Sequence, residues 1–124
     1  MKTRVPSANG FTLVEIMIVV AFIGLLAAIA IPNFVRARTT AQMNACINNL
    51  SKIDAAIQEW AMETRKDTAA PVAYSDISGY MKNSVTCPSG GTSFGNSYSI
   101  TTVAEKPVCL KISSSHKLPQ DTAN

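Results

Sequence analysis

One carboxylate stands inside the most apolar region of the chain. Glu15 is the only charged residue between positions 11 and 35, and it follows Gly10 and Phe11 closely. A charge at the centre of a membrane helix costs about 2.5–3.5 kcal/mol on insertion scales, so it is expected to face a partner or water. One helical turn from Phe11, Glu15 would lie near the interface, where the helix dipole favours an anion. This placement indicates a functional carboxylate; the other interpretation is an interfacial acid on an ordinary single-span anchor.

Three cysteines and one histidine are the remaining residues suited to metal or redox chemistry. Cys46, Cys87, Cys109 and His116 contain no C-x-x-C pair and follow no zinc spacing, so no metal site is predicted. His116 stands in a polar stretch, which predicts a solvated side chain. Three disulfide pairings, or none, are open. We favour Cys87 with Cys109, because both lie in the C-terminal part and closing that loop of ~20 residues is worth about 3 kcal/mol.

No group of residues indicates catalysis. A single histidine excludes most catalytic triads, and the sequence has neither a phosphate-binding loop nor carboxylates paired at a plausible spacing. The net charge of +3 comes from scattered basic residues that form no stripe, so nucleic acid is not an expected partner. We therefore expect a protein that is not an enzyme and needs no cofactor.

The N-terminal residues divide into a short leader and a membrane segment. Residues 1–10 are polar and basic, and residues 11–35 are almost wholly apolar. About 25 residues at 1.5 Å each are enough to span a bilayer with some tilt. Gly24 and Pro32 are the only helix-breaking residues there, and membrane helices tolerate both. Pro32 predicts a kink or a melted turn, because it removes one backbone hydrogen bond.

Residues 36–66 continue as an amphipathic helix. Apolar residues recur there at steps of three and four: Met43, Ile47, Leu50, Ile53, Ile57, Trp60 and Ala61. Since neither Gly nor Pro interrupts residues 33–70, one helix from Phe11 to about Arg65 is predicted, roughly 80 Å long. Trp60 is expected to pack in the core. A helix this long needs lateral partners.

Beyond the helix, the pattern predicts short elements. Residues 74–82 form a short helix with Ser75 as its N-cap. The turn-rich residues 86–97 are not expected to be regular. Residues 97–103 and 107–112 alternate polar and apolar side chains, which is typical of an antiparallel hairpin.

Together these segments predict an α+β fold. Its long N-terminal helix, half apolar and half amphipathic, packs against a small head, residues 67–124, with an antiparallel sheet. In the second strand Val108, Leu110 and Ile112 share a face. The last residues are polar, although Leu118 can fold back onto the head.

The junction between Gly10 and Phe11 resembles the class III signal of type IV pilins and type II secretion pseudopilins. The match includes the basic leader, the FTLVE start with Glu15, and an apolar stretch that ends in IAIPNF. The resemblance is close over residues 1–40, looser over the amphipathic helix and slight in the head. It implies that a prepilin peptidase cuts between Gly10 and Phe11 and N-methylates Phe11.

The resemblance also implies a filament. Glu15 would meet the Phe11 amino group of a neighbouring subunit and set the axial register. The chain would sit in inner-membrane lipid with its head in the periplasm, and an inner-membrane platform would assemble it into a periplasmic or cell-surface filament. In filaments of this family, the stretch corresponding to Gly24–Pro32 loses helicity.

Three functions stay open. A head this short is similar to that of type II secretion pseudopilins, which is our first expectation; a pilus pilin for adhesion, motility or DNA uptake is the alternative. No acidic cluster resembles the calcium loop of many major pseudopilins, since Asp121 stands alone. A third possibility is a conventional signal peptide cleaved after Ala30, which would release a secreted binding module or leave it tethered to the membrane.

Overall fold

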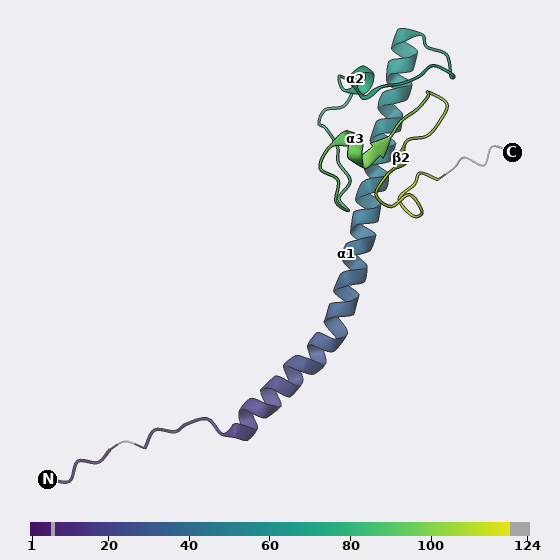
Figure 1. Ribbon diagram of the computed structural model, residues 1–124. Helices are drawn as coiled ribbons and strands as arrows, with labels where there is room; N and C mark the ends of the chain where they lie inside the picture. The colour runs from purple at the N-terminus through teal and green to yellow at the C-terminus, as the bar shows by residue number, and fades with distance from the viewer. Residues whose placement is uncertain (6, 120–124) are drawn as a thin grey trace. The chain divides into compact units, whose positions relative to one another are not determined.

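The computed structural model describes residues 1–5 and 7–119. Its elements, in chain order, are α1 (Leu13–Thr64), α2 (Tyr74–Ile77), α3 (Phe94–Ser97), β1 (Tyr98–Ser99) and β2 (Val108–Cys109). Figure 1 labels all of them except β1. The expected α+β fold, with one long N-terminal helix and a small antiparallel sheet, is confirmed.

The chain divides into two compact units, Met1–Ala37 and Arg38–Asn124, and α1 belongs to both. In the first unit, the large apolar side chains from Leu13 to Val35 are 50–74% exposed. The most apolar part of α1 has a mean hydropathy of 2.8, so by length and composition this helix can cross a membrane.

In the second unit, one stripe of α1 forms the base of the core. Its buried residues are Cys46, Leu50, Ile53, Ala56, Ile57, Trp60 and Ala61. The three- and four-residue steps seen in the sequence are therefore confirmed from Leu50 onward, and Trp60 packs in the core as expected. Cys46 and Ala56 also belong to the stripe, although the sequence pattern did not single them out.

α1 ends in a left-handed turn. Arg65 has φ 51°, and the N–H groups of Arg65 and Lys66 donate to the carbonyls of Met62 and Ala61 at 3.4 and 2.9 Å. These two bonds form a Schellman motif, which satisfies carbonyls that the helix end would otherwise leave unpaired. The helix therefore stops at Thr64, one residue before the expected end.

The head consists of short elements and loops alongside the C-terminal half of α1 (Figure 1). The short helix expected over residues 74–82 is present as α2, but it ends at Ile77 and its N-cap is Ala73, so the assignment of Ser75 was wrong. The N–H of Ala73 donates to Asp76 at 2.9 Å, which is the carboxylate half of a capping arrangement. Ile77 at the end of α2 is fully buried.

The segment from 86 to 97, expected to be irregular, contains α3. Asn96 explains this difference, because its side-chain oxygen accepts the N–H groups of Thr92 and Ser93 at 3.1 and 3.2 Å. These bonds hold the start of the helix, as side-chain caps do. The rings of Tyr74 and Phe94 stack at 4.3 Å and tie α3 to α2.

The expected hairpin is present but short. Tyr98 pairs with Cys109 and Ser99 with Val108 in antiparallel register. The stretch after β1 instead pairs with the linker after α1, through bonds from Val72 N to Thr101 O at 2.9 Å and from Val103 N to Ala70 O at 3.1 Å. Beyond the two-residue ladder, the alternating residues after β1 therefore bond to the linker after α1 and not to the second strand of the hairpin.

β2 turns its cysteine inward. Of Val108, Leu110 and Ile112, which were expected to share a face of the second strand, only Val108 lies in β2; all three are exposed, whereas Cys109 is fully buried. Leu118 is buried, so the chain after β2 does fold back onto the head.

Candidate functional site

The Gly10–Phe11 junction lies outside the helix. Both residues precede α1, and the Phe11 side chain is 89% exposed. A Cβ atom at Gly10 would meet no atom within 4 Å among the described residues beyond its two chain neighbours. An exposed peptide bond without helical hydrogen bonds is the kind that proteases cut most readily. The geometry is therefore compatible with cleavage at this junction.

Thr12 and Glu15 cap the first turn of α1. The N–H of Thr12 donates to Oε2 of Glu15 at 2.9 Å, and the N–H of Glu15 donates to Oγ1 of Thr12 at 3.3 Å. This reciprocal pair is a capping box, and it explains why the helix begins at Leu13. The exposed carboxylate thus lies at the positive end of the helix dipole, one turn from Phe11.

Gly24 and Pro32 both lie inside α1, with helical residues on either side. A Cβ atom at Gly24 would meet no atom of another part of the described chain within 4 Å, so no contact among the described residues requires a glycine there. The loss of helicity between these two residues stays a prediction.

The three cysteines and the histidine come together in the second unit. Cys46 lies on α1, Cys87 on the loop before α3, Cys109 on β2 and His116 on the segment after β2. All four are buried, with exposures of 0, 2, 0 and 3%. One ligand atom from each lies within 4.8 Å of the others. We call these four residues the Cys/His cluster.

This arrangement changes two expectations. His116 was expected in solvent, but the chain after β2 folds back and buries it. Cys46 was expected to lie apart from the other cysteines, yet it lies beside them. The sulfur atoms of Cys87 and Cys109, the favoured disulfide pair, are 3.6 Å apart as free thiols, and their pairing stays a prediction.

The surroundings of the sulfur atoms differ. Burial raises the pKa of the Cys46 thiol to about 12. Burial also raises the pKa of Cys109, but the backbone N–H groups of Ile112 and Lys111 donate to its sulfur, and with the other thiols they give a lowered pKa overall. The surroundings of Cys109 therefore favour a thiolate more than those of Cys46 do.

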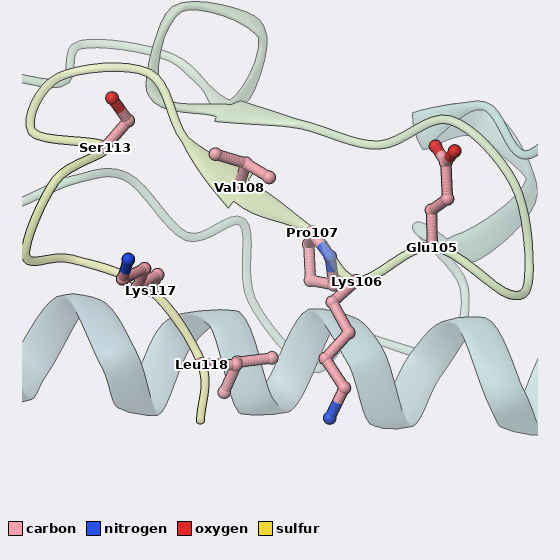
Figure 2. Close-up of a pocket in the computed structure, with 7 residues that line it drawn as sticks. All are labelled: Glu105, Lys106, Pro107, Val108, Ser113, Lys117 and Leu118. Atoms are coloured by element: carbon pink, nitrogen blue, oxygen red, sulfur yellow. The ribbon is translucent and has the colours of Figure 1, made fainter. Parts of the chain in front are cut away.

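Two contacts fix the segment after β2 that carries His116. The N–H of His116 donates to the carbonyl of Ile112 at 3.0 Å, and Leu118 is buried two residues later. Figure 2 shows Lys117 and Leu118 on this segment and Val108 on β2, around a pocket of about 480 Å³. The pocket is open and its charged residues are exposed, so it suggests no specific ligand.

A family model described as the prokaryotic N-terminal methylation motif matches residues 6–31. The type IV major pilin protein PilA of Myxococcus xanthus is 50% identical over 48 residues, which are 39% of this chain and 22% of PilA. The fimbrial protein EcpC of Eikenella corrodens is 36% identical over 87 residues, 68% of this chain and 57% of EcpC. A ComG operon protein 3 homolog of Bacillus licheniformis is 31% identical over 82 residues, 66% of this chain and 84% of that protein.

This chain belongs to the type IV pilin and pseudopilin family. It spans less than two thirds of the length of PilA and of EcpC. No solved structure matches the chain. PilA and EcpC are named as pilin and fimbrial proteins, so the expectation that this pilin-like chain is not an enzyme agrees with its relatives and stays a prediction. Asp121, on which the expectation about calcium rested, lies outside the described residues.

Proposed function

We propose that this pilin-like chain is a structural subunit of a type IV-like filament. The observation that carries the proposal is the apolar first unit of α1, whose large side chains from Leu13 to Val35 are all at least half exposed. Fully burying one such side chain is worth about 1.5–3 kcal/mol, so a helix of this kind must enter lipid or a bundle of like helices. A filament subunit does both in turn.

Cleavage and methylation at the N-terminus would prepare α1 for the bundle of like helices in the filament. We propose that a prepilin peptidase cleaves between Gly10 and Phe11 and methylates the new amino group of Phe11. This proposal is supported by the match to the methylation motif and by the exposed, non-helical junction. Cleavage places a cation next to the capping box of Thr12 and Glu15.

After cleavage, two donors would compete for the Glu15 carboxylate. In the single chain its carboxylate accepts the N–H of Thr12. In a bundle of helices, away from water, the methylated amine of a neighbouring Phe11 would form a stronger, charge-assisted bond with the same carboxylate. Since the pairing requires one axial offset between subunits, it would set the register of the filament.

Gly24 and Pro32 would let the packed helix lengthen. The Pro32 ring removes one backbone hydrogen bond, and glycine lowers helix stability by about 1 kcal/mol relative to alanine. We propose that the segment between them is the part of α1 that melts most easily on assembly.

The location follows from the same helix. Before assembly, α1 would cross the inner membrane once, with the leader in the cytoplasm and the head in the periplasm. The partners would be the lipid, the peptidase, an inner-membrane assembly platform and other pilin-like subunits. The filament would end in the periplasm or at the cell surface.

Within the family, we propose a pseudopilin of a type II secretion system, because the described part of the head is built from four short elements, α2, α3, β1 and β2, with a two-residue antiparallel ladder. A pilus pilin is the second candidate, favoured by the names of PilA and EcpC.

Two measurements test the proposal. Mass spectrometry of the mature N-terminus is expected to find methylated Phe11; a chain beginning at Ile31 would instead show cleavage after Ala30 and contradict the filament. Deletion of the gene is expected to abolish secretion without loss of sheared surface filaments. Loss of surface filaments with normal secretion would contradict the pseudopilin assignment and favour the pilus pilin.

A further inference from the structure

A single disulfide bond does not account for all four residues of the Cys/His cluster. A bond between Cys87 and Cys109 would use two of its four ligand atoms and leave a buried thiol and a buried imidazole beside it. These four side chains reach one point from four separate segments: α1, the loop before α3, β2 and the segment after β2. Such convergence needs an explanation that includes all four.

The spacing of the four ligand atoms fits a tetrahedral metal ion. Atoms about 2.3 Å from a zinc ion, at the corners of a tetrahedron, lie about 3.8 Å from one another. The sulfur atoms of Cys87 and Cys109 are already 3.6 Å apart. All ligand atoms lie within 4.8 Å of one another. Shifts of about 1 Å, which side-chain rotations supply, would complete the tetrahedron.

His116 supplies an independent observation. The side chain is only 3% exposed, and its Nδ1 atom has no hydrogen-bond partner among the described residues. A buried polar atom without a partner costs about 1–3 kcal/mol, and folded proteins rarely leave one. A metal ion bound at this nitrogen would satisfy it.

Hydrogen-bond donors also surround the sulfur atoms. The hydroxyl of Tyr98 lies in hydrogen-bonding contact with Cys46 and is itself held by Asn49 Nδ2 at 3.0 Å. The N–H groups of Lys111 and Ile112 donate to the sulfur of Cys109. Donors of this kind orient metal-bound thiolates and offset part of their charge.

We propose that Cys46, Cys87, Cys109 and His116 bind one zinc ion as a structural site. Three thiolates and one imidazole form a standard set of structural zinc ligands, whereas calcium and magnesium require oxygen. The four protein ligands fill the tetrahedron and leave no position for a substrate, so the site stabilises the head and does not catalyse. The zinc site would link α1 to the loop before α3, to β2 and to the segment after β2.

Elemental analysis of the full chain tests this proposal. The chain is purified in mild detergent, without a histidine tag or chelator, and its metal content is compared with its protein concentration. We expect about one zinc per chain and three thiols that react only after chelation and unfolding. Less than about 0.1 zinc per chain, with one reactive thiol in denaturant, would show a disulfide and overturn the proposal. Iron in place of zinc would also overturn it.

Variants at His116 identify the fourth ligand. Replacing a residue that only orients a metal ligand typically weakens metal binding ~10–100-fold. His116→Ala removes a ligand itself, so we expect it to weaken zinc binding by at least this factor, measured by competition with a chromophoric chelator. His116→Cys keeps a ligand and should retain one zinc. Ser115→Ala, an exposed neighbour, is the matched control. Zinc affinity unchanged in His116→Ala would contradict the assignment of this histidine.

Removing zinc from the unmodified chain separates the site from effects of mutation. Trp60 lies in the core of the head, 8% exposed, so its fluorescence reports whether the head is folded. A chelator is expected to red-shift this emission, and added zinc to reverse the shift. Emission that does not respond to the chelator would contradict a structural role for the metal.

Discussion

Thr12 and Glu15 bind each other's backbone N–H groups, at 3.3 and 2.9 Å, across the first turn of α1. The capping box gives the carboxylate a local role in the single chain, before any neighbour is present. The same carboxylate lies one helical turn from Phe11, whose amino group the prepilin peptidase would expose. Capping and assembly can therefore be separated experimentally.

Asn49 joins α1 to the head through two hydrogen bonds. Its Nδ2 donates to the carbonyl of Thr86 at 3.1 Å and to the hydroxyl of Tyr98 at 3.0 Å. Asn49→Ala leaves both acceptors without this partner, so we expect it to destabilise the head by about 1–3 kcal/mol. Chemical denaturation followed by Trp60 fluorescence measures the change.

Gln42 provides the matched control for Asn49. It is also an amide on α1 that donates to a loop carbonyl, that of Pro88, but at 3.4 Å and in an exposed position. Gln42→Ala should change stability by less than about 0.5 kcal/mol. Equal effects of the two substitutions would contradict the special role of Asn49.

Gly91 packs against the backbone of Cys87. A Cβ atom there would lie 2.6 Å from the Cys87 nitrogen and 2.1 Å from Oγ of Ser97. Because the backbone cannot move as a flexible side chain does, Gly91→Ala should destabilise the head by about 1–3 kcal/mol, the usual cost of overpacking. Thermal unfolding measures this.

Gly95 is the comparison for Gly91. It lies in α3, and a Cβ atom there meets nothing within 4 Å in the part of the chain that the structure describes. Gly95→Ala should therefore be neutral or slightly stabilising, since alanine favours helix. If both alanine variants unfold at the same temperature, the close contact at Gly91 has no energetic consequence.

Tyr80 responds to alkaline pH through Glu63. Its hydroxyl donates to the Glu63 carboxylate, and this bond raises the pKa of Tyr80 above its usual value of about 10. Since the raised pKa belongs to the folded state, the bond contributes fully below about pH 10 and is lost as the pH rises through the pKa of folded Tyr80.

Tyrosinate absorbance, compared between the unmodified chain and Tyr80→Phe, isolates this titration. Glu63→Gln removes the negative charge and should lower the pKa of Tyr80 toward its usual value. A midpoint that Glu63→Gln does not move would contradict the pairing.

The sequence predicted α1 well because helical periodicity is a local property. Leu50, Ile53 and Ile57 repeat along one stripe, and all three are fully buried. Cys46 lies on the same stripe, four residues before Leu50, and the repeat includes it once cysteine is treated as a buried apolar residue.

The Cys/His cluster could not be predicted, because its ligands are distant in sequence. His116 stands among serines and lysines, which locally indicates solvent. Its burial depends on the return of the chain to the head, marked in the sequence only by Leu118. Similarly, the local alternation that predicted a longer hairpin gave no sign that residues 101–103 pair with the linker after α1.

The most direct test of the proposed filament compares two substitutions at the capping box. Glu15→Gln keeps a side chain that can accept the Thr12 N–H but removes the charge, whereas Thr12→Ala removes the hydroxyl cap and keeps the charge. The measurement is the fraction of processed subunit that sediments as filaments. If the charge of Glu15 pairs with a neighbour's Phe11 amine, Thr12→Ala assembles and Glu15→Gln does not. Normal assembly of Glu15→Gln would contradict the account.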